Sequence, residues 1–516
     1  MISSLPTVLL ALIPIALAAP APHPVAAPVA HPMITPRASL TDRTPSRVQE
    51  RDIISSIEGL GSYLTSVLGT YPSYIASGVP NFFQDFPTGT AVMSSLGIND
   101  DDLAATPTQV LNIPGYANWT NQGWNLRVHG NVFKQPNISE SKLNDLANVF
   151  LVGTSVEDLP AAQASQARNL TAEIFVVQQG NVNVSFHLEP APSQGGDGES
   201  GGSSAVTPPG GAQNISIVGQ TTIEGDYDQF IQIANVSGPG GYLAPGNETS
   251  ALQRLNVYTD GTLTGNATSY LVPESGLTII SDIDDILRVT KIYEPKEGLL
   301  NSFARAFTPW MNMPDIYANW SRSIPNFHFH YLTTTPEQVT RNYMEFIYET
   351  YPGGSFDTRP LNFSDVSATL SIRKFLLTKI FETFPNRKFI LVADTSNSDV
   401  MKDYPEMATD FPGQVQCIFL RNTSSTDSGD KFPYDTSGFK GLNQSQYMFF
   451  NVPDDLTNLD IVNGQCYNST IVQNVTFSEQ GLPFGLSKKS AGGRVTSWNA
   501  VSVAWVALIG AVVAML

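Results

Sequence analysis

GLTIISDIDDILRVT, residues 276–290, joins a short apolar run to a cluster of acids. The run LTII (277–280) contains β-branched residues and is long enough for one buried strand of a parallel sheet. Asp282, Asp284 and Asp285 follow directly. In open α/β sheets the ligand crevice lies outside the carboxyl ends of the strands. The stretch therefore predicts a strand that delivers carboxylates to a substrate.

Two acids spaced i, i+2 after a strand could act as nucleophile and as acid/base in phosphoryl transfer. Asp282 could attack a phosphoryl group as nucleophile, while Asp284 could protonate the leaving oxygen and then activate water. Mg²⁺ would reduce the repulsion between an anionic nucleophile and an anionic phosphate. The alternative is that acids after a strand only cap a helix or contact solvent.

Strand-like and helix-like segments alternate from residue 276 onward. The predicted strands after the first are FHFHYL (327–332), KFILVA (388–393) and VQCIFL (415–420), and an apolar helical face lies within 371–384. This alternation predicts an α/β domain with a parallel sheet and helices on both of its faces.

The region before it, residues 106–275, has a different pattern. Short alternating runs rich in Val, Ile, Thr and aromatic residues are separated by turn residues, and they include 125–133, 171–178, 182–190, 215–223, 229–236 and 253–260. This spacing predicts an antiparallel β-sandwich, with the Gly/Ser/Pro-rich segment 193–211 as a long loop within it. The sandwich carries no catalytic constellation, so we expect it to act as a scaffold or an accessory binding domain.

Each later strand of the predicted parallel sheet ends in a polar side chain. Thr333 follows the second strand, and Asp394 and Asp399 follow the third. Arg373 and Lys374 begin the intervening helix. Parallel strands would bring these groups to Asp282 and Asp284, where Thr333 could bind a phosphoryl oxygen and Asp394 could complete a carboxylate set for Mg²⁺.

The order Asp-x-Asp, Thr, base, Asp resembles the haloacid dehalogenase superfamily of phosphatases. The neighbouring text is more specific: SDIDDILRVT, GLLNSFARAFTPWMNMPDIYANW, HYLTTTPEQV, TFPNRKFILVADTSNSD and FPGQVQCIFLR together resemble the catalytic domain of the fungal actin-patch phosphatidate phosphatase family. The resemblance covers residues 277–421, a quarter to a third of the chain. It implies a Rossmann-like domain and Mg²⁺-dependent hydrolysis of phosphatidate to diacylglycerol.

The resemblance also implies roles for individual residues. Asp282 matches the nucleophile, Asp284 the acid/base, Thr333 the second-motif hydroxyl and Asp394 a metal ligand. The basic residue matches best at Arg373, with Lys374 as the alternative. Mg²⁺ would be held by Asp282, the backbone carbonyl of Asp284 and Asp394, with Asp399 in the outer shell.

The chain departs from the family pattern at four positions. Ile286 stands where the family has Thr, Glu337 where it has Trp, and Ala393 and Ser396 replace the two glycines that flank the metal-binding Asp. None of these changes removes a charge that the mechanism needs. They motivate a second hypothesis, a catalytically degenerate surface glycoprotein that acts as a binding or structural module.

The two ends of the chain carry the pattern of a secreted, lipid-anchored protein. Residues 1–19 read as a signal peptide cleaved near Ala18 or Ala19, 20–50 as a disordered leader or propeptide, and 51–105 as a helical lead-in. The catalytic domain would then span 276–478. Residues 479–516 read as a spacer and a glycosylphosphatidylinositol (GPI) anchor signal, with Ser490 as the anchored residue, although a tail-anchored span is the rival interpretation.

The sequons and the cysteines are also typical of a secreted protein. Cys417 and Cys466 are the only cysteines, and in an oxidising compartment they would form one disulfide; the alternative is two buried thiols. The sequence contains fourteen Asn-x-Ser/Thr sequons: Asn118, Asn137, Asn169, Asn183, Asn214, Asn235, Asn247, Asn266, Asn319, Asn362, Asn422, Asn443, Asn468 and Asn474.

Charge further limits the partners. The formal net charge of −18 argues against nucleic acid and against electrostatic attraction to anionic headgroups. The signals at the two ends of the chain predict a location at the plasma membrane or cell wall. We therefore expect a phospholipid of the outer leaflet or a soluble organic phosphomonoester as substrate. The sequence leaves the oligomeric state open.

Overall fold

The computed structural model describes residues 93, 96–151, 153–191, 210–237, 241–247, 251–291, 293–359, 366–427 and 436–473. All of these residues belong to one compact unit of the chain, Ser39–Leu516. The predicted signal peptide, leader and anchor signal with Ser490, most of loop 193–211, and the sequons at Asn362 and Asn474 lie outside the described residues. None of the helices in the described part of the chain combines the length and the apolar character that a membrane span requires.

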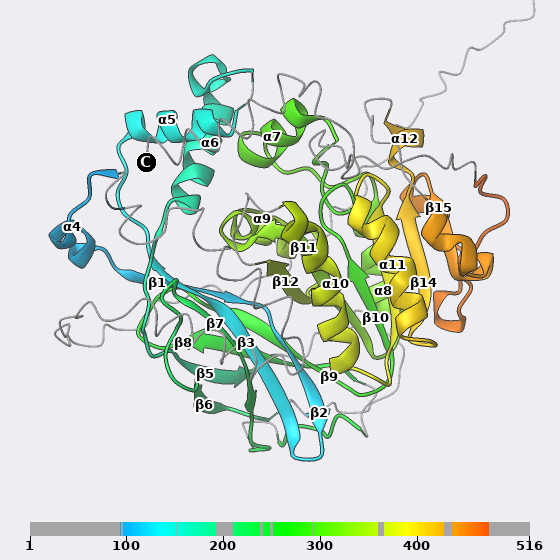
Figure 1. The fold of residues 1–516 in the computed structure, drawn as a ribbon. Coiled ribbons are helices and arrows are strands. Elements are labelled where there is room, and N and C mark those ends of the chain that lie inside the picture. The colour runs from blue at the N-terminus through cyan, green and yellow to red at the C-terminus, as the bar shows by residue number, and fades with distance from the viewer. Residues whose placement is uncertain are drawn as a thin grey trace, which may run out of the picture. The chain divides into compact units, whose positions relative to one another are not determined.

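Six parallel strands form one sheet at the centre of the predicted catalytic domain (Figure 1). They are β10 (Leu277–Ser281), β11 (Phe327–Pro336), β12 (Ser355–Arg359), β13 (Lys388–Asp394), β14 (Val415–Arg421) and β15 (Tyr447–Phe450), in the spatial order β12-β11-β10-β13-β14-β15. The four strands predicted from sequence are present, and the predicted parallel pairing is confirmed. β12 and β15 extend the sheet at its two edges.

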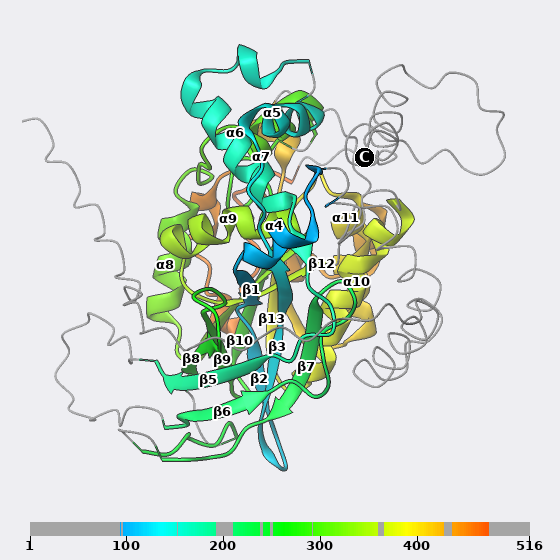
Figure 2. The same cartoon turned by 90° about the vertical axis from the view of Figure 1, so that its left-hand side faces the viewer.

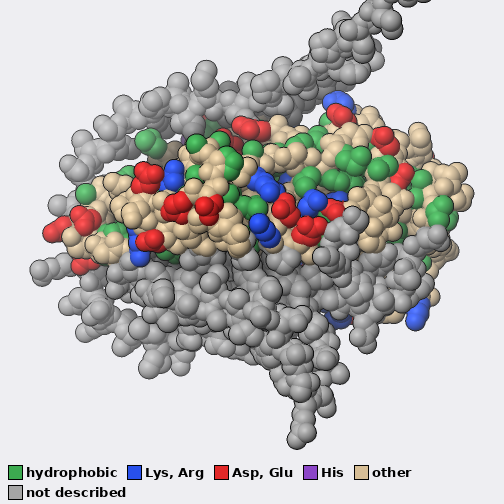
Figure 3. Space-filling model, turned by 90° about the horizontal axis from the view of Figure 1, so that it is seen from above, with side chains coloured by type: hydrophobic (Ala, Val, Ile, Leu, Met, Phe, Trp, Pro, Cys, Tyr) green, Lys and Arg blue, Asp and Glu red, His purple; other side chains and the backbone are tan. Residues whose placement is uncertain are grey.

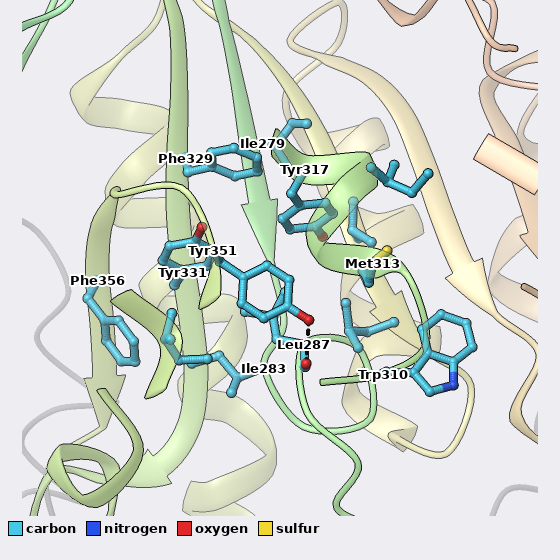
Figure 4. Packing of buried hydrophobic residues seen from close by; sticks show 14 of the residues in the cluster. Ile279, Ile283, Leu287, Trp310, Met313, Tyr317, Phe329, Tyr331, Tyr351 and Phe356 are labelled. Carbon is cyan, nitrogen blue, oxygen red and sulfur yellow. Dashed lines mark hydrogen bonds between the residues drawn. The ribbon is translucent and has the colours of Figure 1, made fainter. Parts of the chain in front are cut away.

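Helices pack on both faces of this sheet, as the alternation predicts. The helices are α7 (Pro295–Phe303), α8 (Met313–Ser323), α9 (Glu337–Thr350), α10 (Val366–Thr383), α11 (Ser398–Asp410) and α12 (Thr423–Thr426). Side chains of one strand alternate between two cores because successive residues of a strand point to opposite faces. Ile279 packs with the residues of α8 and α9, and Ile280 packs with those of α10 and α11. Figure 4 shows the first of these cores, in which the rings of Tyr317 and Phe329 stack.

A second, separate sheet contains nine strands from the region before residue 276. They are β1 (Thr108–Ile113), β2 (Tyr116–Thr120), β3 (Gly123–Lys134), β4 (Val177–Gln178), β5 (Ser185–Pro190), β6 (Gln213–Ser216), β7 (Asp226–Gln232), β8 (Gln253–Thr259) and β9 (Ala267–Val272). All pairs are antiparallel except β2 with β9, which is parallel. The long central strand β3 pairs with four neighbours, which join the strands in one hydrogen-bonded sheet (Figure 2). The division of this sheet into a two-layered sandwich, and the domain boundary at 275, stay predictions.

The strand predicted over residues 171–178 is wrong for most of its length. Residues up to Ile174 belong to α6 (Ala161–Ile174), which follows α5 (Glu140–Val149), and only the two residues of β4 pair in the sheet. The buried residues of α6 are Ala164, Ala167, Leu170, Thr171 and Ile174, at helical spacing. Two of these five residues are alanines, so the helical period is visible only when Ala is counted as apolar. In the predicted lead-in, the described helix is α4 (Asp100–Ala105), whose Asn99 cap forms a capping box with Asp102.

The structure joins Cys417, on β14, to Cys466 by a disulfide. Nine of the described sequons carry an exposed asparagine: Asn137, Asn169, Asn183, Asn214, Asn235, Asn247, Asn266, Asn319 and Asn443. Asn118 and Asn468 are half-buried, and Asn422 is buried.

Candidate active site

The candidate site lies where the strand order of the parallel sheet reverses. The chain runs outward from β10 through β11 to β12, and then returns to the other side of β10 as β13. Such a switch point leaves a crevice outside the carboxyl ends of the two central strands. The backbone N–H of Asp282 donates to the carbonyl of Val392 at 2.8 Å, which fixes the end of β10 beside the end of β13. Asp394, the last residue of β13, and Asp282, the first residue after β10, therefore lie at the same edge of the sheet.

Asp282 is only 1% exposed, and polar groups surround its carboxylate. Its Oδ1 accepts a hydrogen bond from the N–H of Ile283 at 2.9 Å. Its Oδ2 lies 3.1 Å from Nη2 of Arg373 on α10, and that arginine is also 1% exposed. Asp282, the predicted nucleophile, and Arg373, the predicted basic residue, thus form an ion pair inside the protein.

The two basic candidates, Arg373 and Lys374, have different surroundings. Lys374 is 38% exposed and pairs with Glu406 and Asp410 of α11, at 2.8 and 3.1 Å. Arg373 lies between Asp282 and Asp399, with its Nε 2.7 Å from Oδ2 of Asp399. Burial alone would lower the pKa of Arg373, but these two carboxylates raise it well above its usual value. Arg373 is therefore a fixed cation between two buried carboxylates.

Asn397 links two of the predicted metal ligands, Asp282 and Asp394, and was not among the residues predicted from sequence. Its Nδ2 lies 3.3 Å from Oδ2 of Asp282 and 3.0 Å from Oδ2 of Asp394. Oδ1 of Asp394 also accepts from the N–H of Ser396 at 2.7 Å. One amide group thus bridges two buried carboxylates at the ends of adjacent strands.

Both carboxylates are destabilised as anions in this environment. Burial raises the pKa of Asp282 to about 7, although Arg373 opposes the shift. Burial, together with the negative charges of Asp285 and Asp282, raises the pKa of Asp394. Two buried acids with raised pKa values and oxygen donors are the chemistry that a hard divalent cation satisfies.

The described residues contain no set of three His, Cys, Asp or Glu side chains arranged to hold a metal ion. The predicted inner set does not need one, because it consists of two carboxylates and a backbone carbonyl. Asp399, predicted for the outer shell, uses one carboxylate oxygen for Arg373 and the other for the N–H of Val400. The donor chemistry fits Mg²⁺ at Asp282 and Asp394, while the role of Asp399 toward a metal stays a prediction.

Asp284 has other partners than Asp282 does. Its Oδ1 accepts hydrogen bonds from Arg288 and from the hydroxyl of Thr290, and its Oδ2 accepts one from the hydroxyl of Thr335 at 3.2 Å. Thr333, the predicted second-motif residue, is buried at the same end of β11 and accepts a hydrogen bond from the N–H of Thr335 at 3.0 Å. The β11 end therefore contributes to the surroundings of Asp284, as the parallel topology predicts.

The partners of Asp284 could have been found in the sequence. Arg288 and Thr290 stand four and six residues after it, inside the stretch that supplied the acids. A charged and a hydroxyl residue in an otherwise apolar segment indicate a buried polar contact, because such groups are rarely buried without a partner. Asn397 offered less signal, since Asn after a strand is also a common turn residue.

Comparison with known proteins agrees with this geometry. Residues 277–422 match the family model described as the catalytic domain of phosphatidate phosphatase APP1. The chain is 25% identical over 190 residues to phosphatidate phosphatase APP1 of Saccharomyces cerevisiae. The aligned stretch covers 34% of this chain and 32% of the relative. It is 27% identical over 169 residues to an uncharacterized protein of Schizosaccharomyces pombe, over 31% and 27% of the two chains.

The chain thus spans about a third of the length of the curated relatives it matches. The match falls on the parallel sheet and its carboxyl-end residues, from β10 through β14. Residues 277–422 are therefore similar to the catalytic domain of phosphatidate phosphatase APP1.

Proposed function

We propose that the protein is an Mg²⁺-dependent phosphatase that hydrolyses a phosphomonoester through an aspartyl-phosphate on Asp282. The observation that carries the proposal is the pairing of a buried Asp282 with a buried Arg373, 3.1 Å apart, at the switch point of the sheet. A carboxylate next to a fixed cation can receive a phosphoryl group whose charge that cation neutralises.

The chemistry divides between the two acids of the β10 turn. Asp282 attacks phosphorus in line, and the bond from phosphorus to the leaving oxygen breaks as Asp284 supplies a proton to that oxygen. Asp284 then takes a proton from water, which attacks the aspartyl-phosphate and releases inorganic phosphate. Arg373 holds a phosphoryl oxygen through both steps, and the Thr333 hydroxyl can donate to another.

Asp282, Asp394 and the backbone carbonyl of Asp284 would hold Mg²⁺. When bound, the ion would neutralise the two carboxylates and polarise the phosphoryl group. The proposal follows from the raised pKa values of Asp282 and Asp394, which leave the crevice in need of positive charge.

The family resemblance suggests phosphatidate as substrate, with diacylglycerol as product. The sequence signals for secretion, N-glycosylation and a GPI anchor suggest a cell-surface enzyme, which would meet an outer-leaflet phospholipid or a soluble organic phosphate. Figure 3 shows the side toward which the carboxyl ends of the parallel strands point, and there acidic and basic side chains are interspersed. Such a surface does not by itself select anionic membranes.

We also propose the haloacid dehalogenase arrangement for the parallel sheet and a sandwich role for the antiparallel one. The first is supported by the central position of β10 and by the order in which Asp282, Thr333, Arg373 and Asp394 follow along the chain. The second rests on the alternating sequence pattern alone.

The test is phosphate release from short-chain phosphatidate and from p-nitrophenyl phosphate, with and without Mg²⁺. We expect metal-dependent release by the wild type and none by Asp282→Asn, a nearly isosteric change. Lys374→Gln is the matched control, because its neighbour Arg373 faces the site and Lys374 does not. Equal silence of wild type and Asp282→Asn across both substrates would contradict the proposal.

One observation favours the second candidate, a degenerate binding module. Both carboxylate oxygens of Asp284 already accept hydrogen bonds from protein side chains, and Ile286 replaces the family's Thr. A site used only for binding would retain phosphate affinity without turnover. Binding of inorganic phosphate or tungstate by a catalytically silent wild type would support this candidate.

A further inference from the structure

We propose that Arg288 is the positioning residue of the reaction: it holds the Asp284 carboxylate in the orientation needed to protonate the leaving oxygen. The inference rests on the proposed function and concerns a residue outside the motif positions discussed above. It follows from the contacts of Asp284, from the packing of Arg288 and from the burial of Ile286.

Ile286 cannot orient the acid/base residue. It is fully buried in the hydrophobic core that also contains Ile283 and Leu287, and an isoleucine side chain has no hydrogen-bonding group. Whatever fixes Asp284 in this chain must therefore come from another position.

Arg288 supplies that contact with two donors. Its Nε and Nη2 lie 3.0 and 2.8 Å from Oδ1 of Asp284, and the hydroxyl of Thr290 lies 2.8 Å from the same oxygen. The Thr335 hydroxyl holds the other oxygen. Three side chains from two segments thus fix the rotation of one carboxylate, and the guanidinium makes the charge-assisted contacts.

Arg288 is itself held rigidly. It is 2% exposed, and its guanidinium carbon lies 4.3 Å from the ring centre of Tyr343 and 5.1 Å from that of Phe307. Its backbone bridges to Pro309, and its Nη2 lies 3.4 Å from the hydroxyl of Ser302. A planar cation packed against two aromatic rings loses little further freedom when it binds a carboxylate, so the acid/base group is preorganised.

A residue that acts through Asp284 should affect one chemical event more than the others. Protonation of the leaving oxygen matters greatly for an alkyl ester and little for an aryl ester such as p-nitrophenyl phosphate, whose leaving group is stable as an anion. Loss of Arg288 should therefore change the ratio of kcat values for the two classes. A change that only loosens the fold would lower both alike.

Arg387 provides a matched control at the opposite end of β10. It is as deeply buried as Arg288, and its guanidinium donates to the carbonyls of Pro273 and Leu277, each at 2.8 Å. It therefore stabilises the amino end of the strand whose carboxyl end leads to Asp284.

The experiment compares Arg288→Met, Arg288→Lys and Arg387→Met by kcat and KM on short-chain phosphatidate and p-nitrophenyl phosphate with saturating Mg²⁺. For Arg288→Met we expect kcat on the alkyl ester to fall about 100-fold and kcat on the aryl ester less than about tenfold, with KM nearly unchanged. Arg288→Lys, which keeps the charge but not the planar fork, should restore part of the loss. Arg387→Met should leave the ratio of the two kcat values at the wild-type value.

Equal losses on both substrates, or the same change of ratio in Arg387→Met, would overturn the inference while leaving the proposed function intact. If Arg288→Met does not fold, as judged by circular dichroism, the ratio in Arg288→Lys decides: an unchanged ratio overturns the inference. A wild type that releases phosphate from neither substrate refutes the proposed function, and the role of Arg288 falls with it.

Discussion

The guanidinium of Arg127, on the central strand of the antiparallel sheet, donates a hydrogen bond of 2.7 Å to the carboxylate of Asp357, on the edge strand β12 of the parallel sheet. Both residues are buried. Arg127 also contacts both carboxylate oxygens of Asp228, which in turn accepts from Lys379 of α10 at 2.8 Å. Asp357, Arg127, Asp228 and Lys379 thus form a continuous series of ion pairs between the sheets. The N–H of Phe356 donates to the carbonyl of Pro114 beside it.

These ion pairs predict that the two sheets unfold together. Arg127→Met leaves the buried Asp357 and the half-buried Asp228 without their main partner, and removing one member of a buried pair typically costs about 3–5 kcal/mol. We expect a loss of this size in the free energy of unfolding, measured by urea denaturation, with a single transition in wild type and variant. Two separate transitions would instead support a sandwich and a catalytic domain that fold independently.

Lys374→Met is the control for that measurement. The Lys374–Glu406 pair is more than one third exposed on each side, so its removal should cost less than about 1 kcal/mol. A comparable loss of unfolding free energy in both variants would mean that the ion pairs between the sheets stabilise the fold no more than a surface pair does.

His129 predicts that acid destabilises the fold at mild pH. It is buried near Arg127, and burial, with the charge of Arg127, lowers its pKa to about 3. Between about pH 6.5 and 3 the unfolded chain therefore binds the proton that the folded chain excludes, so stability falls as the pH is lowered through this range. The full effect of this one group is at most about 5 kcal/mol. His129→Gln should flatten the dependence of Tm on pH over this interval, and an unchanged slope would contradict the assignment.

Much of the parallel sheet could be predicted from sequence because its strands are buried on both faces. Runs such as KFILVA have one possible role in a soluble domain of this kind, and the acids after them follow from topology. The antiparallel region was harder to predict, because 171–178 contains β-branched residues at the end of a helix in which two of the five buried residues are only alanine. Tertiary packing there outweighs local propensity.

The candidate site was predictable in its residue types and less so in its pairings. The choice of Arg373 over Lys374 depends on which side of α10 faces the crevice, and at adjacent positions the two side chains point about 100° apart. The roles of Arg288 and Asn397 depend on contacts across a turn and across two strands. Sequence spacing places such residues near the site without showing what they bind.

Asn397 predicts a measurable coupling between Mg²⁺ and stability. Its amide bridges Asp282 and Asp394, so Asn397→Leu should destabilise the metal-free protein by about 2 kcal/mol through loss of hydrogen bonds to charged groups. Saturating MgCl₂ should offset part of this loss, because a cation between the carboxylates replaces the amide. We therefore expect Mg²⁺ to raise the Tm of the variant more than that of the wild type, as measured by scanning fluorimetry. A smaller shift in the variant would instead identify Asn397 as a metal ligand.

The sequons predict a selective pattern of glycans if the protein enters the secretory route. Asn422 is 8% exposed and its side chain accepts a hydrogen bond from Ser424, whereas Asn319 is exposed on α8. Glycopeptide mass spectrometry of the protein secreted from a eukaryotic host should show a glycan on Asn319 and none on Asn422. Occupancy at Asn422 would contradict its buried placement, and an unmodified Asn319 would argue against the secretory route.

The disulfide between Cys417 and Cys466 predicts a large effect of reduction. It closes a loop with a sequence separation of 49, and the chain-entropy model gives about 4 kcal/mol for a loop of that length. β14 lies between β13 and β15, so the cross-link fixes the C-terminal segment against the interior of the sheet that carries Asp394. Cys417→Ala/Cys466→Ala should therefore lower the urea midpoint without changing KM, and dithiothreitol should lower the midpoint of the wild type but not that of the double variant. Iodoacetamide labelling of both cysteines in denatured, unreduced protein would instead establish the two-thiol alternative.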